Sequence, residues 1–294
     1  MSANKYMPSA PIIPPAPSLP TGSNNKVCFI TGCSSGIGRQ LSIEAYKRGY
    51  ILAATDINLS ALEALSESEK WDSRRVHLAA LDVVQPQNWD STMKGVIQRF
   101  GRIDLLLNVA GVLNAGYVYE PCPIQDVEMH VNVNLKGVIY GSYAAAQYMV
   151  AQKGGHIINI SSLAGIAPVP GLSVYTATKY GVRGYSLAIA SELRPFKVYV
   201  TAVCPDAVNT PMLHRQINMP QAVLSFSGKP LEPADIVQLI FDKVIPKRPL
   251  EALIPRGRGI ITKLTTCFPQ LGLWLRKPFE QIGQRKQRVL QAQK

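Results

Sequence analysis

Short hydrophobic runs recur along the chain from residue 26 and alternate with longer segments of helical periodicity. The runs are V-C-F-I at 27, Y-I-L-A-A at 50, R-V-H-L-A-A-L at 75, I-D-L-L-L at 103, H-I-I-N-I at 156 and V-Y-V-T-A-V at 198. Several are apolar on both faces, as strands buried in a parallel sheet are. Strands that alternate with helices form right-handed crossovers. The pattern predicts an α/β fold, a doubly wound parallel sheet with helices on both faces.

The same pattern divides the chain into three parts. Residues 1–25 hold six prolines among small polar residues, which predicts a disordered proline-rich leader. The rhythm of strands and helices fills 26–256, where E-A-L-I at 251–254 predicts a last short strand and nothing marks a second core. We therefore expect one domain at 26–256 and a basic amphipathic extension at 257–294.

Composition excludes several classes of protein. The chain is 47% hydrophobic and 17% charged, which is typical of a globular protein rather than a disordered one. No apolar run is long enough to predict a membrane span, and the N-terminus lacks the pattern of a secretory signal. The five cysteines are scattered without C-x-x-C spacing, so we expect reduced thiols, a cytoplasmic protein and no metal site.

The first predicted strand runs into T-G-C-S-S-G-I-G at 31–38, and a helix is expected to begin near Arg39. Glycines in such a turn let backbone N–H groups approach a pyrophosphate at the start of the helix. An ordinary loop is the alternative, but the position between strand and helix favours a dinucleotide site of the Rossmann type. The predicted contacts are Gly32, Ser34, Ser35, Gly36, Ile37 and Gly38.

Asp56 ends the second predicted strand, eighteen residues beyond Gly38. A carboxylate there can accept both hydroxyls of an adenosine ribose, and it repels a 2′-phosphate. Arg39 would partly offset that repulsion, and a turn or helix cap is the structural alternative for Asp56. We therefore expect NAD as the cofactor and regard NADP as the less favoured choice.

Two further strands carry small or polar residues at their carboxyl ends. The third predicted strand ends at Asp82 and Val83, and the fourth at Asn108, Ala110 and Gly111. In an open parallel sheet, ligands bind beyond the carboxyl ends of the strands. We therefore predict that these residues also contact the cofactor.

A set of motifs follows the same order along the chain. They are T-G-C-S-S-G-I-G at 31, D-V at 82, N-V-A-G at 108, N-L-K-G at 134, I-S-S at 160, Y-T-A-T-K at 175 and P-D-A-V-N-T at 205. In these motifs and their order, residues 26–256 resemble the short-chain dehydrogenase/reductase family of the ordinary single-domain type. The resemblance implies a catalytic tetrad of Asn134, Ser162, Tyr175 and Lys179.

The resemblance also implies where the cofactor and a second subunit would bind. Cofactor contacts are implied for Tyr175, Lys179, Pro205, Asp206, Val208 and Thr210. It implies that Lys179 holds the nicotinamide ribose and that Asn134 supports a water-linked path for protons. Helices near 132–152 and 173–194 are expected to pair between subunits, which predicts a homodimer or homotetramer.

The chemistry of Tyr175 and Lys179 can be argued from their spacing. Residues four apart lie one turn apart on the same face of a helix, so both side chains can reach one pocket. A nearby ammonium favours phenolate, and we expect Lys179 to lower the pKa of Tyr175 from about 10. Ser162 is predicted to hydrogen-bond the substrate oxygen, while Ser161 points to the opposite side. Taken alone, the tyrosine and lysine could be a solvent-facing pair and the two serines a turn. Together with the glycine loop and Asp56, they predict an oxidoreductase.

Two positions differ from the usual sequence of the family's motifs. Val109 stands where the family has asparagine, so it supplies no side-chain hydrogen bond. Asp206 stands where the family has glycine, which would permit a positive φ or close approach to the nicotinamide. Aspartate tolerates such a turn better than most residues and puts a negative charge there. The contact expected from Thr210 is retained.

The segment after Pro205 is expected to cover the substrate. Its apolar residues are Met212, Leu213, Ile217, Met219, Val223, Leu224 and Phe226. This lining favours a hydrophobic secondary alcohol or ketone, such as a lipid, retinoid or steroid, over a sugar. The alternatives are an NADPH-dependent reductase of another small ketone and a non-catalytic dinucleotide sensor tethered to a membrane.

The basic charge is concentrated at the end of the chain. The formal net charge is +12, of which the 12 Lys or Arg and 2 Glu from Lys243 onward contribute +10. The stretch 255–279 mixes these cations with Ile, Leu, Phe and Trp274. An anionic membrane surface is therefore a candidate partner, which would make the protein a peripheral membrane protein. A helix that closes the substrate pocket or packs on a sister subunit is the alternative, and no nucleic acid is expected.

Overall fold

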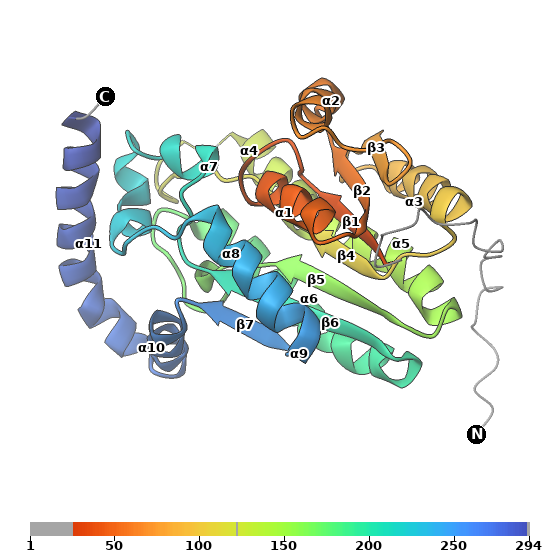
Figure 1. The fold of residues 1–294 in the computed structure, drawn as a ribbon. Coiled ribbons are helices and arrows are strands. Elements are labelled where there is room, and N and C mark those ends of the chain that lie inside the picture. The colour runs from red at the N-terminus through yellow and green to blue at the C-terminus, as the bar shows by residue number, and fades with distance from the viewer. Residues whose placement is uncertain (1–25, 122, 293–294) are drawn as a thin grey trace.

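The computed structural model of the protein describes residues 26–121 and 123–292 (Figure 1). The leader predicted at 1–25 lies outside the described residues.

Seven parallel strands form one sheet at the centre of the molecule. They are β1 (Val27–Thr31), β2 (Ile51–Asp56), β3 (Val76–Ala80), β4 (Leu105–Asn108), β5 (Gly155–Ile160), β6 (Val198–Pro205) and β7 (Glu251–Ile254). Their order in the sheet is β3-β2-β1-β4-β5-β6-β7. The direction of winding reverses between β1 and β4, and ligands in such sheets bind beyond the strand ends at this point. The predicted fold class and all seven strands are confirmed.

The helices cover both faces of the sheet and its carboxyl edge. They are α1 (Gly36–Lys47), α2 (Leu59–Ser68), α3 (Pro86–Phe100), α4 (Ile124–His130), α5 (Gly137–Ala151), α6 (Ser173–Leu193), α7 (Pro211–His214), α8 (Pro233–Leu239), α9 (Ile245–Lys247), α10 (Arg256–Cys267) and α11 (Pro269–Ala292). A π-helical segment, η1 (Val131–Lys136), leads into α5, and a 3-10 segment, η4 (Pro220–Phe226), follows α7.

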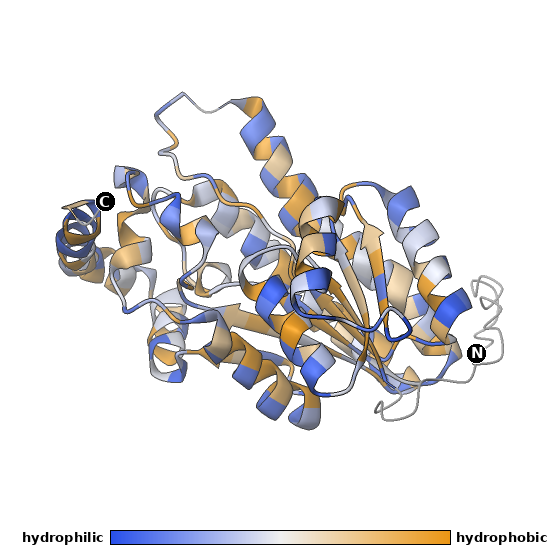
Figure 2. Cartoon of the chain, turned by 45° about the horizontal axis from the view of Figure 1, so that its top comes forward, coloured by the Kyte–Doolittle hydropathy of each residue, from blue (hydrophilic) through white to orange (hydrophobic). Residues whose placement is uncertain are grey.

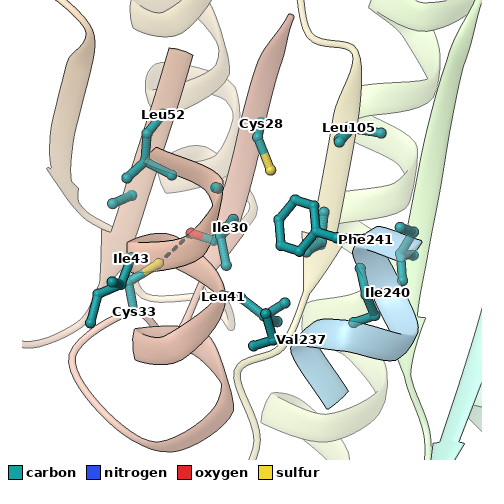
Figure 3. Close-up of a cluster of buried hydrophobic side chains, with 14 of the residues drawn as sticks. Cys28, Ile30, Cys33, Leu41, Ile43, Leu52, Leu105, Val237, Ile240 and Phe241 are labelled. Atoms are coloured by element: carbon teal, nitrogen blue, oxygen red, sulfur yellow. Dashed lines mark hydrogen bonds between the residues drawn. The ribbon is translucent and has the colours of Figure 1, made fainter. Parts of the chain in front are cut away.

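Each strand sends alternate side chains into two separate cores, which explains why the runs are apolar on both faces. Cys28 and Ile30 of β1 pack with α1 and the segment after α8, as Figure 3 shows. Val27 and Phe29 pack against α3, α5 and α6 on the other face. Burying a side chain of this size contributes about 1.5–3 kcal/mol each. The sheet is therefore a rigid base for the residues at its carboxyl edge.

The C-terminal helices pack on this domain. In Figure 1, α11 is the outermost element and runs alongside the segment that holds α7 and η4. Gln287 of α11 is buried and its Nε2 donates to the carbonyls of Met219 at 2.8 Å and Gln216 at 3.1 Å. Leu290 joins the small cluster around Phe226. None of the helices within 26–121 and 123–292 combines the length and apolarity needed to cross a bilayer.

Candidate active site

The turn between β1 and α1 has the geometry of a phosphate-binding loop. Gly32 and Gly36 adopt φ values of 73° and 54°, in the left-handed region that favours glycine. A Cβ on Gly38 would lie 2.0 Å from the carbonyl oxygen of Gly32, so α1 starts closer to the loop than any side chain allows. The backbone therefore leaves room, at the start of a helix, for an anionic group. This cradle fits the pyrophosphate of a dinucleotide.

Asp56 ties the end of β2 to this loop. Its Oδ2 accepts hydrogen bonds from Ser34 N at 2.9 Å and Ser34 Oγ at 2.7 Å. Its Oδ1 accepts from Asn58 N at 2.9 Å, and Asn58, not Asp56, caps α2. Asp56 therefore positions the glycine loop as well as presenting a carboxylate at the edge where a ribose would lie.

The other predicted strand-end residues differ in where they point. Asn108 Nδ2 donates to Asn159 Oδ1 at 2.8 Å inside the protein, and Asn108 Oδ1 is buried without a described partner. The Asp82 carboxylate accepts from Val84 N at 3.1 Å, and Val83 packs against Gly137. Only the backbone of Asn108 can therefore face the cofactor edge, because its side chain is directed into the interior.

A residue that the sequence argument missed holds this edge together. The hydroxyl of Thr31 accepts the N–H groups of Val109 at 2.9 Å and Ala110 at 3.1 Å. These bonds join the end of β1 to the loop after β4, on either side of the point where the winding reverses. The threonine at the start of T-G-C-S-S-G-I-G could have indicated this role, because a buried hydroxyl at the end of a strand needs a hydrogen-bond partner.

The structure brings Ser162, Tyr175 and Lys179 together. Ser162 follows β5, and its Oγ donates to Pro205 O at 3.4 Å and accepts from Ala164 N at 3.0 Å. The hydroxyl of Ser162 also faces the phenol of Tyr175 on α6 closely enough to influence its pKa. The ammonium of Lys179, one turn further along, lies 5.5 Å from the centre of the Tyr175 ring and donates to Ile160 O at 2.9 Å.

The neighbouring Ser161 points the other way, as its position in an extended strand predicts. Its Oγ donates to Lys179 O at 2.8 Å, and its backbone N–H donates to Val203 O at 2.7 Å. Ser161 thus anchors α6 to β5, while Ser162 faces the cavity.

The prediction that Lys179 lowers the pKa of Tyr175 is wrong for this structure. Burial raises the pKa of Tyr175 to about 12, and the Ser162 hydroxyl opposes this rise only in part. Burial also lowers the pKa of Lys179 to about 8. The ammonium is directed at the Ile160 carbonyl and the face of the ring, so desolvation is the stronger influence on the phenol.

Asn134 is held by the backbone on the opposite side of the site. It is fully buried in η1, where its Oδ1 accepts from Val112 N at 2.8 Å and its Nδ2 donates to Val112 O at 2.9 Å. A Cβ on Gly111 would lie 3.2 Å from Asn134 Oδ1 and 3.8 Å from Lys179 Nζ. Gly111 therefore occupies the place between the amide and the ammonium, where only a small residue fits.

The substitution of aspartate for glycine at residue 206 has a structural explanation. Asp206 has no positive φ, so the left-handed turn considered for this position is not formed. Its Oδ2 instead lies 3.0 Å from Arg258 Nε of α10, and Arg258 also donates to Ser227 Oγ at 2.6 Å. Burial raises the pKa of the Asp206 carboxyl, and Arg258 opposes that rise. The negative charge thus anchors the C-terminal extension above β6.

Thr210 and Val208 continue the same edge. Thr210 directly precedes α7, and a Cβ on Gly36 would lie 3.3 Å from its methyl group, so this segment abuts the glycine loop. Val208 is largely buried and packs with the core on the α1 side. Thr210 is therefore placed to reach a group seated on the loop, whereas Val208 offers mainly its backbone.

A cavity of about 680 Å³ opens above Ser162 and Tyr175. The predicted site residues that line it are Ile37, Gly111, Ser162, Tyr175, Lys179, Pro205, Asp206, Val208 and Thr210. The others lie outside it: Gly32, Ser34, Ser35, Gly36, Gly38, Asp56, Asp82, Val83, Asn108, Ala110 and Asn134. The cavity is thus the substrate side of the site, and the glycine loop with Asp56 forms the side where an adenosine would lie.

The apolar residues predicted to cover the substrate have two different roles. Met212, Leu213 and Leu224 line the cavity, whereas Ile217 and Phe226 pack in the cluster beneath α11. The rest of the roof comes from residues that the sequence argument did not assign to the site. They are Arg258, Ile261, Thr262, Thr265, Thr266, Pro269, Gly272, Leu273, Leu275, Arg276 and Phe279. The extension therefore covers the pocket, as one of the interpretations of its sequence predicted.

Comparison with known proteins agrees with this geometry. The sequence model of the family described as short chain dehydrogenase matches residues 26–221. A 3-oxoacyl-acyl-carrier-protein reductase, FabG, from Thermotoga maritima is 33% identical over 218 residues, which are 72% of this chain and 88% of the relative. Human 15-hydroxyprostaglandin dehydrogenase (NAD+) is 35% identical over 210 residues, 68% of this chain and 76% of that protein.

Solved structures show the same fold. A short-chain dehydrogenase/reductase from Burkholderia phymatum in complex with NAD has a TM-score of 0.75 and 25% identity, covering 84% of this chain and 95% of that one. ElxO with NADP bound has a TM-score of 0.70 over 78% of this chain and 96% of its own, and at 23% identity the likeness concerns the fold alone. The family match ends before α10, so the part of the roof that α10 and α11 contribute lies beyond it.

Proposed function

Because the chain belongs to the short-chain dehydrogenase family, we propose that it transfers a hydride between NAD and a hydrophobic secondary alcohol or ketone, of lipid-like, retinoid-like or steroid-like shape. The observation that carries the proposal is the cavity of about 680 Å³ whose floor is the Ser162 and Tyr175 pair. Apolar side chains dominate its walls and roof, which favours an apolar substrate with one polar atom held at the floor.

The side chains at the floor divide the work of the reaction. Nicotinamide, when bound, supplies or accepts the hydride. Ser162 Oγ orients the substrate oxygen and stabilises charge that develops on it. Tyr175, protonated at neutral pH because of its raised pKa, donates its proton to that oxygen in reduction and takes it back in oxidation. Lys179, which carries a positive charge below its pKa of about 8, would hold the nicotinamide ribose beside the phenol.

Asp56 supports NAD as the cofactor within a family whose solved members bind NAD or NADP. Its carboxylate is fixed by Ser34 and Asn58 at the edge of the glycine loop, where a 2′-phosphate would meet a negative charge. The variant Asp56→Asn removes the charge and keeps an oxygen acceptor for Ser34. We expect the ratio of kcat/KM for NAD over NADP to fall by about tenfold or more. An unchanged ratio would assign Asp56 to the loop alone.

The substrate class is tested by cofactor absorbance over a graded series of secondary alcohols and ketones. Each added methylene that enters an apolar cavity is worth about 0.8 kcal/mol, so kcat/KM should rise about fourfold per methylene until the cavity is filled. Sugars of equal size are the control series and should react poorly. The lipid hydroxyl named in the human relative makes hydroxylated fatty acids natural members of the panel. A preference for sugars, or a flat series, would refute the proposal.

We also propose that α5 and α6 pair in a homodimer or homotetramer. Tyr143 on α5 is 64% exposed in the single chain, which supports a surface available for a second copy. Light scattering of the full chain measures the oligomeric state directly. A monomer at micromolar concentration would refute this part of the proposal without affecting the reaction.

A further inference from the structure

The turn between α10 and α11 presents a group of exposed apolar side chains. This apolar corner consists of Ile260, Ile261, Leu264, Phe268, Leu273 and Trp274. Trp274 is 78% exposed, Phe268 64% and Leu273 61%. Isolated exposed apolar residues are common, but this group of six within residues 260–274 indicates an interaction surface.

The periodicity of α10 explains why its apolar side chains face away from the domain. Arg258, Thr262 and Thr266 share the face that meets the domain, where Thr266 donates to the Ile166 carbonyl at 2.5 Å. Ile260 and Leu264 are one turn apart on the other face and are each 51% exposed. The helix is thus anchored by polar contacts and presents its apolar side outwards, the reverse of a helix that only covers a core.

Positive charge accompanies the apolar corner. Within 256–292 the sequence has eight Lys or Arg and one Glu. The exposed cations Arg256, Lys277, Arg285 and Arg288 make no ion pair among the described residues. In Figure 2, the helix beside the C-terminus, α11, carries both hydrophilic (blue) and hydrophobic (orange) positions. The extension therefore combines Trp, Phe and Leu with unpaired cations on one exposed surface.

We propose that the apolar corner and the outer side of α11 dock on an anionic lipid bilayer. Trp274, Phe268 and Leu264 would enter the interface, while the cations contact lipid headgroups. A second copy is the weaker occupant, because it would bring two positively charged surfaces together. The inference does not depend on which alcohol the enzyme oxidises.

Docking in this way would face the cavity toward the bilayer. Ile261 and Leu273 both line the cavity and are more than half exposed at the apolar corner. The roof of the cavity and the docking surface are thus two sides of the same pair of helices. An apolar substrate dissolved in the bilayer would then lie next to the entrance.

The experiment is co-sedimentation of the full-length protein with phosphatidylcholine vesicles, with and without phosphatidylserine. The variant Phe268→Ala/Trp274→Ala removes the two aromatic rings of the apolar corner, neither of which lines the cavity. The matched control, Ile57→Ala/Leu250→Ala, removes side chains that are 71% and 54% exposed and lie outside α10 and α11, directly after β2 and directly before β7. Arg285→Glu/Arg288→Glu tests the charge. Binding is measured without cofactor or substrate, so it stands apart from activity.

We expect the native protein and the control to partition onto the anionic vesicles, and the aromatic double variant to bind at least about tenfold more weakly. The charge-reversal variant should lose binding to anionic vesicles to a similar extent. Circular dichroism confirms that each variant is folded. The proposal is overturned if the native protein stays in the supernatant, or if the aromatic variant pellets as well as the control. Equal binding to both kinds of vesicle would overturn the role of anionic lipid.

Discussion

The cofactor side and the substrate side of the site are built in different ways. The cofactor side consists of strand ends and backbone, and its decisive positions are glycines such as Gly32, Gly36 and Gly38. The substrate side is roofed by helices from the end of the chain, held by side-chain contacts such as the pair of Asp206 and Arg258. Backbone geometry is fixed once the sheet forms, whereas a roof held by a few side chains can be changed by few substitutions. Cofactor binding and substrate choice are therefore separable in this protein.

The largest effect is expected where the two sides meet, at Tyr175. Tyr175→Phe removes the proton that passes to the substrate oxygen and leaves the ring packed in place, so kcat should fall about 1,000-fold. Cofactor affinity, measured by fluorescence titration, should change little because the glycine loop is untouched. Tyr185→Phe is the matched control on the same helix, because Tyr185 packs against the core on the other face of the sheet and does not line the cavity. Retained turnover in Tyr175→Phe would remove the basis of the mechanism.

Gly38→Ala should damage the cofactor side alone. The added Cβ would lie 2.0 Å from the Gly32 carbonyl oxygen, and backbone cannot yield as a side chain can. Displacing the loop should weaken cofactor binding by about a hundredfold, as steric overpacking of about 1–3 kcal/mol implies. Gly184→Ala on α6 is the control, because its Cβ would meet nothing within 4 Å. If both variants bind cofactor like the native protein, the loop is not the dinucleotide site.

The cofactor side was the predictable one for a physical reason. A buried strand followed by a glycine turn is specified by residues adjacent in the sequence, so hydrophobic periodicity and the position of Gly32 and Gly36 locate it. The same holds for Tyr175 and Lys179, which helical periodicity puts on one face. The pKa of Tyr175 was predicted in the wrong direction, because desolvation depends on what the fold packs around the phenol.

The roof could not be derived from local pattern. Asp206 and Arg258 are 52 residues apart, and no periodicity connects them. Two signals were present: aspartate at a position usually held by glycine, and Arg258, Ile261, Thr262 and Thr265 at the spacing of one helix face. Neither identifies its partner, because long-range pairs are set by topology. The charge of the extension was plain from sequence, but its place over the cavity was not.

Breaking the pair of Asp206 and Arg258 should affect the substrate side alone. Arg258→Met leaves a largely buried carboxylate without its partner, so α10 should move and KM for a bulky ketone should rise about tenfold, with kcat changing less. Both side chains retain some contact with water, so the loss of stability should be limited to about 1–2 kcal/mol.

The double variant Asp206→Gly/Arg258→Met separates the charge from the packing. With no carboxylate left to bury, part of the stability lost in Arg258→Met should return, and thermal unfolding measures that coupling. Dissociation constants for NAD serve as the control and should be equal in all three proteins. If KM were unchanged and NAD binding were weakened, the pair would belong to the cofactor side, and the separation of the two sides would fail.

The smallest effect concerns the buried ammonium of Lys179. Burial lowers its pKa in the folded protein to about 8, from about 10.5 in an unfolded chain, so the unfolded state binds more protons between these values. This contribution to stability therefore rises with pH across that window, by about 1 kcal/mol between pH 7.5 and 9. Lys179→Met removes the titrating group, and denaturant unfolding of both proteins isolates its share from that of the buried thiols. The native protein should gain stability relative to Lys179→Met as the pH rises. If the two plots of stability against pH were parallel, the ammonium would be solvated. The floor of the cavity would then contain more water than the structure indicates.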